Sequence, residues 1–371
     1  MPGSYSRDTA ELDAEILQAI GAWHVRGRQL ADAEFDDLAL RILAYQLRYN
    51  LPYARYCASL GVSGRSLPAT WEAIPAVPAA AYKEAALCTF DPAAAALAFE
   101  TSGTTSGTGG RHYMEKRDLY DAALLAGFDR FMLPDAARLR YFNLVPNPHD
   151  RPESSLGYMM ARVAAGRGDG ETGWYLRGDR LFADAFVADI ADAIEREQPA
   201  CIAGTAFALV RLLDDLEQRD RVFRLPAGSR IMETGGFKGR ARFVERGEFY
   251  RRLAASFGIS EDRVVAEYGM TELTSQYYDR DPGGPGGRVK AAAPWLRSRV
   301  VGPDGRRLPR GTVGALVHVD LANRSSCVAV ATEDLGVEAD GGIVLLGRER
   351  GAQLRGCSLD AEALLAAGDG A

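Results

Sequence analysis

The sequence predicts an α/β protein in which helices cover a mostly parallel β-sheet. From residue 140 onward, short apolar runs alternate with amphipathic segments. This alternation is typical of layered α/β folds, because parallel strands are joined by crossover helices. In addition, residues 8–62 carry apolar side chains at helical spacing, and residues 288–346 have the pattern of a small β region. Binding sites in such folds gather at the carboxyl ends of the strands.

The first segment, residues 8–62, is predicted to be helical because its apolar residues recur mostly three or four positions apart. These residues are Leu12, Ile16, Ile20, Trp23, Leu38, Leu40, Ile42, Leu43 and Leu47. Three prolines at positions 68, 75 and 78 then interrupt the pattern. An apolar run follows at 94–99, and the polar segment after residue 111 is predicted to be helix-like.

The α/β core is predicted to lie within residues 91–280. Its expected strands are 140–145, 200–203, 230–233 and 264–268. Its expected helices are 154–165, 182–197, 206–217 and 239–257. Ser154 and Ser155 favour a helix start, because a serine side chain accepts hydrogen bonds from the N–H groups of the first turn.

A turn-rich stretch of glycine and proline at residues 281–287 separates the core from the small β region. Strands are expected there at 313–320, 327–332 and 343–346, and Asp340-Gly341-Gly342 favours a hairpin between the last two. Beyond Gly347 the chain is too short for a core of its own.

The bulk composition excludes several classes of protein. The chain has 371 residues, of which 47% are hydrophobic and 25% charged, so it can build an ordinary globular core. A net charge of −6 argues against nucleic acid or an anionic membrane as the main partner. No apolar run is long enough to span a bilayer, and the first residues lack the order of a signal peptide. We therefore expect a cytoplasmic protein.

The cysteines and histidines give no sign of a disulfide framework or of a metal site built from histidine. Five scattered cysteines, an odd number, fit reduced thiols. Four histidines without short mutual spacing make a histidine-built metal centre unsupported. Two interpretations stay open for His112 and for His149. Each histidine either lines a binding pocket or lies on a loop surface.

The most informative stretch is the glycine- and hydroxyl-rich run at residues 101–111. Glycines permit backbone angles that other residues resist, so backbone N–H groups and hydroxyls can wrap a phosphate chain. The candidate phosphate-binding residues are Ser102, Gly103, Thr104, Thr105, Ser106 and Gly107. The run lacks the lysine of a P-loop, and a plain surface loop is the alternative interpretation.

Further polar clusters stand where predicted strands give way to loops. They occupy residues 233–238, 267–272, 332–336 and 347–348. Thr271 offers a hydroxyl to a phosphate oxygen, and Glu272 offers a hard carboxylate oxygen suited to Mg²⁺. Asp334 can accept hydrogen bonds from the hydroxyls of a ribose, and Arg348 can donate to phosphate or ribose oxygens. Taken singly, each cluster also fits an ordinary turn or a solvated surface acid.

In their order along residues 101–348, these clusters resemble the adenylate-forming superfamily of acyl-activating enzymes. The most specific match is Tyr-Gly-Met-Thr-Glu, which contains Tyr268, Gly269, Thr271 and Glu272. The resemblance implies that residues 102–107 hold the phosphates of ATP, that Thr271 contacts the α-phosphate and that Glu272 binds Mg²⁺. It also implies that Gly235 and Gly236 flank the adenine, and that Asp334 binds the ribose with help from Arg348.

The sequence departs from the superfamily pattern in two places. Gly109-Gly110-Arg111 stands where the loop usually ends in Pro-Lys. We also expect no counterpart of the usual lid domain and its catalytic lysine, because the sequence has only 23 residues after Arg348. Lys238 is a candidate source of positive charge, with an ordinary surface lysine as the alternative.

The tail narrows the resemblance to the acyl-protein synthetase (LuxE) family. The shared features are Thr-Ser-Gly-Thr-Thr-Ser-Gly, Glu-Thr-Gly-Gly-Phe-Lys-Gly and a terminal Leu-Arg-Gly-Cys-Ser-Leu. Members of that family activate a fatty acid with ATP, carry the acyl group on a cysteine near the C-terminus and pass it to a partner reductase. By position, Cys357 would be this acceptor. Nearby arginines would favour its reactive thiolate form, whereas a small buried hydrophobe is the alternative.

The sequence therefore predicts an adenylate-forming domain at residues 1–346, divided into a helical part (1–90), an α/β core (91–280) and a small β region (288–346). Residues 347–371 are predicted to form a rudimentary lid. The predicted function is ATP- and Mg²⁺-dependent activation of a carboxylic acid, with transfer of the acyl group to Cys357 and then to a partner protein such as an acyl reductase. The alternatives are direct transfer to an acyl carrier protein, coenzyme A or an amine, and a nucleotide-binding subunit without catalysis.

Overall fold

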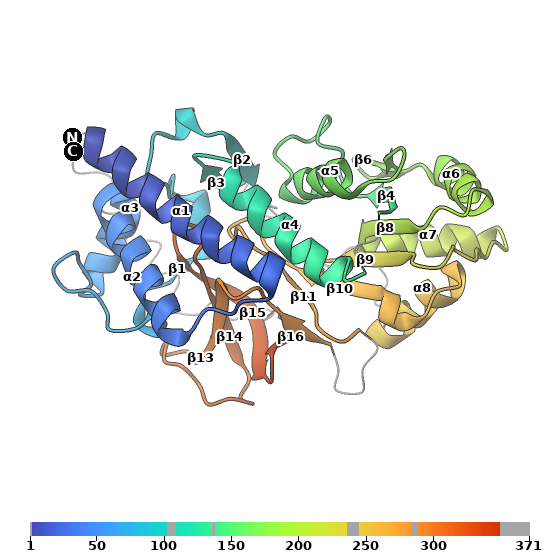
Figure 1. Ribbon diagram of the computed structural model, residues 1–371. Coiled ribbons are helices and arrows are strands. Elements are labelled where there is room, and N and C mark those ends of the chain that lie inside the picture. The colour runs from blue at the N-terminus through green and yellow to red at the C-terminus, as the bar shows by residue number, and fades with distance from the viewer. Residues whose placement is uncertain (1, 102–108, 136–137, 236–244, 283–287, 349–371) are drawn as a thin grey trace. The chain divides into compact units, whose positions relative to one another are not determined.

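The computed structural model describes residues 2–101, 109–135, 138–235, 245–282 and 288–348. The chain divides into two compact units, each assembled from separate segments (Figure 1). Unit 1 contains residues 1–126, 270–276 and 292–371, and unit 2 contains residues 127–269 and 277–291. No helix among the described residues combines the length and the apolar character needed to cross a membrane.

The N-terminal part of unit 1 is helical, as predicted, and consists of α1 (Pro2–Arg26), α2 (Asp32–Tyr49) and α3 (Leu51–Ser59). The break before α3 is made by Asn50, whose side chain accepts a hydrogen bond from the backbone N–H of Tyr53. The helices pack through the apolar residues that set the sequence period, and α1 also contributes Trp23 to an edge-to-face pair with Trp295.

Four antiparallel strands form the β region of unit 1. They follow the order β13 (Leu296–Val301), β14 (Gly314–Asp320), β15 (Ala329–Ala339) and β16 (Gly342–Arg348), and β1 (Val77–Pro78) pairs with β15 in parallel. The predicted hairpin is confirmed, with Gly341 at a φ of 79° in its turn. The predicted end of a strand at residue 332 is wrong, because β15 continues to Ala339. Asp334 pairs with Arg348 of β16, and the pairing with β14 resumes at Leu335 after an irregularity at residues 332–334, so the strand continues through two residues of low strand propensity.

The flanks of the glycine-rich run form a second, two-stranded sheet in unit 1. β2 (Leu97–Glu100) pairs with β3 (Arg111–Met114), and Glu100 lies opposite Arg111. The chain after residue 111 therefore begins with a strand that the sequence did not predict, and a helix follows it. The buried positions of β3 alternate, which is the pattern of a strand with one covered face. The next helix, α4 (Asp118–Met132), begins only after this strand.

Unit 2 contains the strands predicted at 140–145, 200–203, 230–233 and 264–268. Its parallel strands lie in the order β5 (Gly173–Trp174), β4 (Arg140–Leu144), β8 (Ala200–Thr205), β9 (Arg230–Thr234) and β10 (Val264–Tyr268), followed by antiparallel β11 (Tyr277–Asp279) and β12 (Val289–Ala291). A short pair, β6 (Leu176–Arg177) and β7 (Arg180–Leu181), stands apart from this sheet. The expected mostly parallel sheet is thus confirmed.

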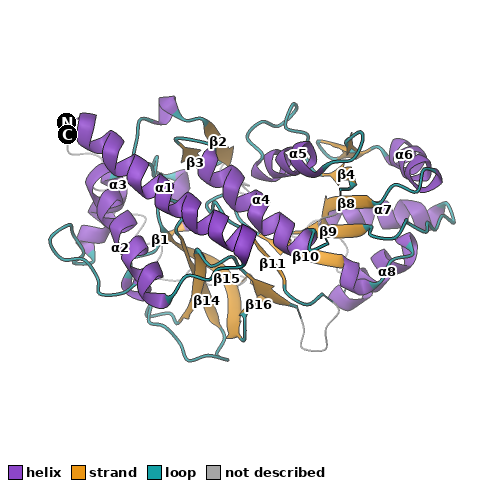
Figure 2. Cartoon of the chain, in the orientation of Figure 1, coloured by secondary structure: helices purple, strands orange, loops and turns teal. Residues whose placement is uncertain are grey.

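Helices cover the sheet of unit 2 as layers, and α7 and α8 lie beside strands β8 to β10 (Figure 2). They are α5 (Ser155–Arg167), α6 (Ala183–Glu195), α7 (Ala206–Gln218) and α8 (Arg246–Phe257). One face of the sheet packs against α6, α7 and α8 in a single apolar cluster that includes Ile202, Ile231 and Val264. Single-turn 3₁₀ helices complete the structure: η1 (Trp71–Ala73), η2 (Ala79–Lys83), η3 (Pro92–Ala94) and η4 (Glu261–Arg263).

Candidate active site

Two hydrogen bonds between Thr101 and Gly110 join the two ends of the glycine-rich loop, and we call this pair of residues the base of the loop. The backbone N–H of Thr101 donates to the Gly110 carbonyl at 2.8 Å, and the Gly110 N–H donates to the Thr101 hydroxyl at 2.9 Å. The two flanks of the loop are thus held together where β2 ends and β3 begins. The predicted phosphate-binding residues themselves, 102–107, lie outside the described residues, so their roles stay predictions.

Gly110 and Arg111 explain part of the departure from the Pro-Lys pattern. A Cβ atom on Gly110 would lie 2.7 Å from the backbone carbon of Tyr82 in η2, which is too close for any other residue without movement. Arg111 is engaged on the exposed side of the strand pair, where its guanidinium lies 2.8 Å from the Glu100 carboxylate. This part of the run therefore serves close backbone packing, and Arg111 is tied to its neighbouring strand.

Thr271 lies against both flanks of the loop. Its carbonyl oxygen accepts a hydrogen bond at 2.7 Å from Nδ1 of His112, which is on β3. Its hydroxyl lies 3.5 Å from the carbonyl oxygen of Glu100, which is on β2. The structure therefore places Thr271 against Glu100 and His112, the described flanks of the glycine-rich run, within unit 1. It also places His112 in the interior, whereas His149 is exposed on a loop.

A loop at residues 321–326 holds the other side of the Thr271 segment. The side-chain amide of Asn323 donates to the Glu272 carbonyl at 2.8 Å. Asp320, at the end of β14, accepts hydrogen bonds from the backbone N–H groups of Thr274 and Ser275 at 3.0 and 2.8 Å. Burial raises the pKa of Asp320 to about 6. The sequence analysis missed both side chains, although an unusual polar run after an apolar strand marks this loop.

Helix α2 in turn holds the 321–326 loop in place. Gln46 is fully buried and donates to the carbonyl of Asn323 at 2.8 Å, while its own side-chain oxygen accepts from the N–H of Val328 at 2.9 Å. A buried polar side chain that is fully hydrogen-bonded fixes its surroundings in one arrangement. The helical layer thus supports the motif segment through two successive sets of hydrogen bonds.

Glu272, the predicted Mg²⁺ ligand, has only 8% of its surface exposed. Within the described residues there is no group of three or more histidine, cysteine, aspartate or glutamate side chains that could hold a metal ion. Mg²⁺ in nucleotide sites is usually bound by one or two carboxylates together with phosphate oxygens and water. A single carboxylate fits this donor set only together with phosphate oxygens and water, so the role of Glu272 as an Mg²⁺ ligand stays a prediction.

Asp334 and Arg348, predicted as partners at a ribose, are brought together. They face each other across β15 and β16, and Nε of Arg348 lies 2.7 Å from the Asp334 carboxylate. Asp334 was expected at the end of a strand but lies inside β15, next to an irregularity in the pairing at Leu335 and Gly336. The side chain of Arg348 is 54% exposed and that of Asp334 only 12%. Arg348 therefore orients a carboxylate that is itself largely covered.

In unit 2, the ends of β9 and β10 place two other predicted motifs side by side. Thr234 lies opposite Glu267 in the parallel pairing, and its hydroxyl donates to the Glu267 carboxylate. Gly235, predicted at the adenine, follows with a φ of 77°, a left-handed conformation that favours glycine. Tyr268 packs against Tyr277 with ring centroids 5.6 Å apart. Gly236 and Lys238 lie outside the described residues.

Buried charges surround this strand end. Lys290 donates to the Asp279 carboxylate and to the Ala266 carbonyl, both at 2.7 Å. Burial lowers the pKa of Lys290, and it raises the pKa of Glu233 and brings that of Glu267 to about 7. The sequence analysis missed this cluster, whose signal is charged residues inside runs that otherwise form buried strands.

The cysteines other than Cys357 are free and buried, and Cys357 lies outside the described residues. Burial raises the pKa of the Cys57 and Cys201 thiols to about 12. It also raises the pKa of Cys88 and moves that of Cys327 well upward. These four thiols are therefore protonated near neutral pH and are poor nucleophiles.

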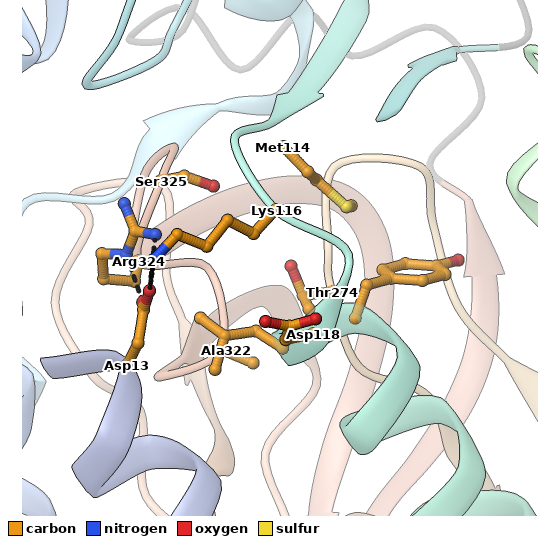
Figure 3. A pocket seen from close by; sticks show the side chains of 10 residues that line it. Asp13, Met114, Lys116, Asp118, Thr274, Ala322, Arg324 and Ser325 are labelled. Carbon is orange, nitrogen blue, oxygen red and sulfur yellow. Dashed lines mark hydrogen bonds and ion pairs between the residues drawn. The ribbon is translucent and has the colours of Figure 1, made fainter. Parts of the chain in front are cut away.

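A small pocket lies beside the Thr271 segment and is lined by Thr274, Ala322 and Arg324 among others (Figure 3). Arg324 and Lys116 both point toward Asp13, at 2.7 and 3.0 Å (Figure 3). The volume of this pocket is about 10 Å³, which is room for one water molecule and not for an acyl chain. A larger hollow of about 650 Å³ lies between α1 and α2, and no predicted site residue lines it.

Comparison with known proteins supports the fold and the family. The family model described as acyl-protein synthetase, LuxE, matches residues 31–365. A search of curated proteins gives no significant match. Many solved structures share the fold.

Two of these structures are of 2-hydroxyisobutyryl-CoA ligase. The open conformation, in complex with 2-HIB-AMP and CoA, has a TM-score of 0.62 and 15% identity, and the match covers 87% of this chain and 77% of that chain. The postadenylation state, in complex with R3-HIB-AMP, has a TM-score of 0.63 and 14% identity, with 85% and 67% covered. At these identities the likeness shows the fold, and it confirms the predicted adenylate-forming domain fold.

A third structure, McyG A-PCP complexed with phenylalanyl-adenylate, has a TM-score of 0.51 and 17% identity, and 70% of this chain is covered. The match covers 48% of McyG A-PCP, and 49–50% of three further matched structures. The chain thus spans about half the length of these proteins.

Proposed function

The chain belongs to the acyl-protein synthetase (LuxE) family of adenylate-forming enzymes, and we propose that it uses ATP to activate a fatty acid and transfers the acyl group to a thiol. The observation that carries this proposal is the position of Thr271, whose carbonyl and hydroxyl face the two strands at the base of the glycine-rich loop. A hydroxyl that is held in place in advance can stabilise charge that develops on a phosphate.

The first proposed step forms an acyl-adenylate. A carboxylate oxygen of the acid attacks the α-phosphorus of ATP, the bond from that phosphorus to the bridging oxygen breaks, and pyrophosphate leaves. Residues 102–107 would hold the phosphates, Thr271 the α-phosphate, and Asp334 with Arg348 the ribose. Glu272 would hold the Mg²⁺, which neutralises phosphate charge when bound. Gly235, Gly236 and Tyr268 belong to the proposed adenine side of the site.

The second proposed step forms a thioester at Cys357. Its thiolate attacks the acyl carbon, the bond from that carbon to the phosphate oxygen breaks, and AMP leaves. Two features support Cys357: its position in the Leu-Arg-Gly-Cys-Ser-Leu tail, and the burial and raised pKa of the other four thiols. The acyl group would then pass to a partner, which we propose to be an acyl reductase or an acyl carrier protein. Lys238 stays a candidate for the charge that a lid lysine would supply.

Two measurements on the full chain test the two steps separately. Exchange of labelled pyrophosphate into ATP, driven by a panel of fatty acids of different length, reports the first step. Absence of exchange with every acid would leave only nucleotide binding and would refute the proposed activity. Intact mass spectrometry after incubation with ATP, Mg²⁺ and the acid reports the second step.

The matched variant for the second step is Cys357→Ser, with Cys88→Ser as the control thiol. We expect Cys357→Ser to keep the exchange reaction and to lose the added acyl mass, because serine is a much weaker nucleophile than a thiolate. Acyl labelling that persists in Cys357→Ser would place the acceptor elsewhere. Exchange without any labelling would favour direct transfer to a carrier protein, coenzyme A or an amine.

A further inference from the structure

His112 is a buried histidine at the base of the glycine-rich loop, and the predicted reaction chemistry gives it no part. It lies on β3, two residues beyond Gly110, with 1% of its surface exposed. Its Nδ1 lies 2.7 Å from the Thr271 carbonyl oxygen. Because a carbonyl only accepts hydrogen bonds, Nδ1 must carry the proton, and Nε2 is then the nitrogen with the lone pair. Among the described residues Nε2 has no hydrogen-bond partner.

The surroundings of His112 keep the ring in this orientation. The ring of Tyr82 meets the imidazole edge to face, with centroids 5.7 Å apart and planes at 80°. Tyr82 is itself anchored, because its hydroxyl lies 3.0 Å from the Ser326 hydroxyl. The backbone of Gly110 packs directly onto Tyr82. The imidazole therefore has one fixed neighbour on its face and one fixed acceptor at Nδ1.

The charge state of His112 is constant over the working range of most enzymes. Burial lowers its pKa to about 4, with the hydrogen bond to Thr271 as a smaller opposing effect. The ring is thus neutral near pH 7 and does not act there as a proton donor in exchange with solvent. A neutral ring that donates one hydrogen bond to a motif backbone has the features of a structural clamp.

We propose that His112 is a positioning residue that holds the Thr271 carbonyl, and through it the Thr271 hydroxyl, against the base of the glycine-rich loop. The inference rests on the proposed function, because it assigns His112 to the adenylate-forming step. Its consequence is that the Nδ1–H donor matters for the rate of that step and not for the affinity of ATP. A displacement of a reacting group by about 1 Å can cost about 100-fold in rate.

Three substitutions separate the hydrogen bond from the bulk of the ring. In His112→Asn, the amide nitrogen takes the place of Nδ1 and keeps the donor. In His112→Gln, the amide reaches the place of Nε2 instead, and His112→Phe keeps the ring volume without any donor. His149→Gln, at the exposed histidine, is the matched control. We expect kcat for pyrophosphate exchange to fall about 10- to 100-fold in the Gln and Phe variants, with KM for ATP within about threefold of wild type.

The result that supports the inference is rescue by asparagine: His112→Asn keeps kcat within about threefold of wild type, as does His149→Gln. Equal loss in the Asn and Gln variants, or wild-type kcat in His112→Phe, overturns it. If one variant does not fold, the contrast between the remaining donor-keeping and donor-lacking variants decides.

A readout that does not depend on activity separates this inference from the proposed function. Amide hydrogen exchange in peptides covering residues 96–114 and 268–276 is expected to speed up in His112→Gln and to stay at the wild-type rate in His112→Asn and His149→Gln. Identical protection in His112→Gln and wild type overturns the clamp. If the variants show this contrast in amide hydrogen exchange but the wild-type protein does not exchange pyrophosphate into ATP, the clamp is supported and the proposed activity is refuted.

Discussion

Thr271 in unit 1 and Thr234 in unit 2 are both motif threonines, but they are held by different kinds of partner. Thr271 is held by a neutral imidazole and lies against a backbone carbonyl. Thr234 donates to Glu267, a buried carboxyl whose pKa burial raises to about 7. The hydrogen bonds of Thr271 are therefore neutral and depend on geometry, and we call them the geometric part. The hydrogen bond of Thr234 depends on the ionisation of a buried carboxyl, and we call it the electrostatic part. We therefore expect altered packing to disturb the Thr271 contacts most, and a change of pH to disturb the Thr234 contact most.

The stability associated with Glu267 and the stability associated with His112 depend on pH with opposite sign. The pKa of Glu267 is raised from 4.5 to about 7, so the stability associated with this group is fully present below about 4.5 and is lost as pH rises through about 7. The pKa of His112 is lowered from 6.5 to about 4. The stability associated with His112 is present above about 6.5 and is lost as pH falls through about 4.

The largest effect is expected from breaking the geometric part with Gly110→Ala. The added Cβ would lie 2.7 Å from the Tyr82 backbone, so β3 or η2 must shift. We expect the free energy of unfolding to fall by about 1–3 kcal/mol and pyrophosphate exchange to fall about 100-fold. Denaturant unfolding and exchange assays measure the two quantities.

Gly64→Ala is the control for this substitution, because a Cβ at Gly64 has nothing within 4 Å and its φ is not in the left-handed region. It should leave both quantities near wild type. Equal behaviour of the two variants would mean that the loop base is not a close-packed junction.

The contrast between the two threonines also shows how far sequence reasoning reaches. The strand at 264–268 is predicted with its observed ends, because a short apolar run follows the amphipathic helix predicted at 239–257 and ends at the Gly269 turn. The cluster of polar residues at strand ends likewise follows from the sequence pattern. Local periodicity thus gives the core strands and points to the loops that carry chemistry.

What the sequence does not show is contact between distant segments. His112 and Thr271 are 159 residues apart, and nothing local to either residue indicates their bond. The polar residues of β3 give a helix-like pattern, but pairing with β2 makes the segment a strand. Glu333 and Asp334 look like the end of a strand, but Asp334 pairs with β16 and the pairing with β14 resumes at Leu335, so β15 continues through them. Buried Glu267 and Lys290 depend on a polar interior that forms only when the strands assemble.

An intermediate effect is expected from Glu267→Gln, which removes the ionisable group from the Thr234 contact. Glutamine keeps an acceptor for the Thr234 hydroxyl but cannot ionise. Wild-type protein should lose stability as pH rises from about 4.5 to about 7, and this loss should be smaller in the variant by about 1–3 kcal/mol over that window. Unfolding free energies measured at several pH values test this.

Two controls accompany this measurement. Glu84→Gln, at an exposed glutamate, should keep the wild-type slope, and His112→Asn should differ from wild type only at acid pH. An unchanged slope in Glu267→Gln would mean that Glu267 is ionised alike in the folded and unfolded protein.

The smallest effect is expected from changing Arg348 in the Arg348–Asp334 pair. The two side chains form an ion pair, but Arg348 is half exposed, so solvent screens it. We expect Asp334→Ala to weaken ATP binding by about 1–3 kcal/mol, roughly the cost of leaving a polar partner unpaired. Arg348→Ala should cost only about 0–1 kcal/mol, because it removes an orienting contact and not the proposed ribose acceptor.

Calorimetric titration of ATP into both single variants and the double variant measures the coupling between the two residues. If Arg348 acts only through Asp334, the double variant should bind ATP as Asp334→Ala does, and high salt should reduce the effect of Arg348→Ala. A loss in Arg348→Ala that equals the loss in Asp334→Ala and adds to it would mean that Arg348 binds the nucleotide directly.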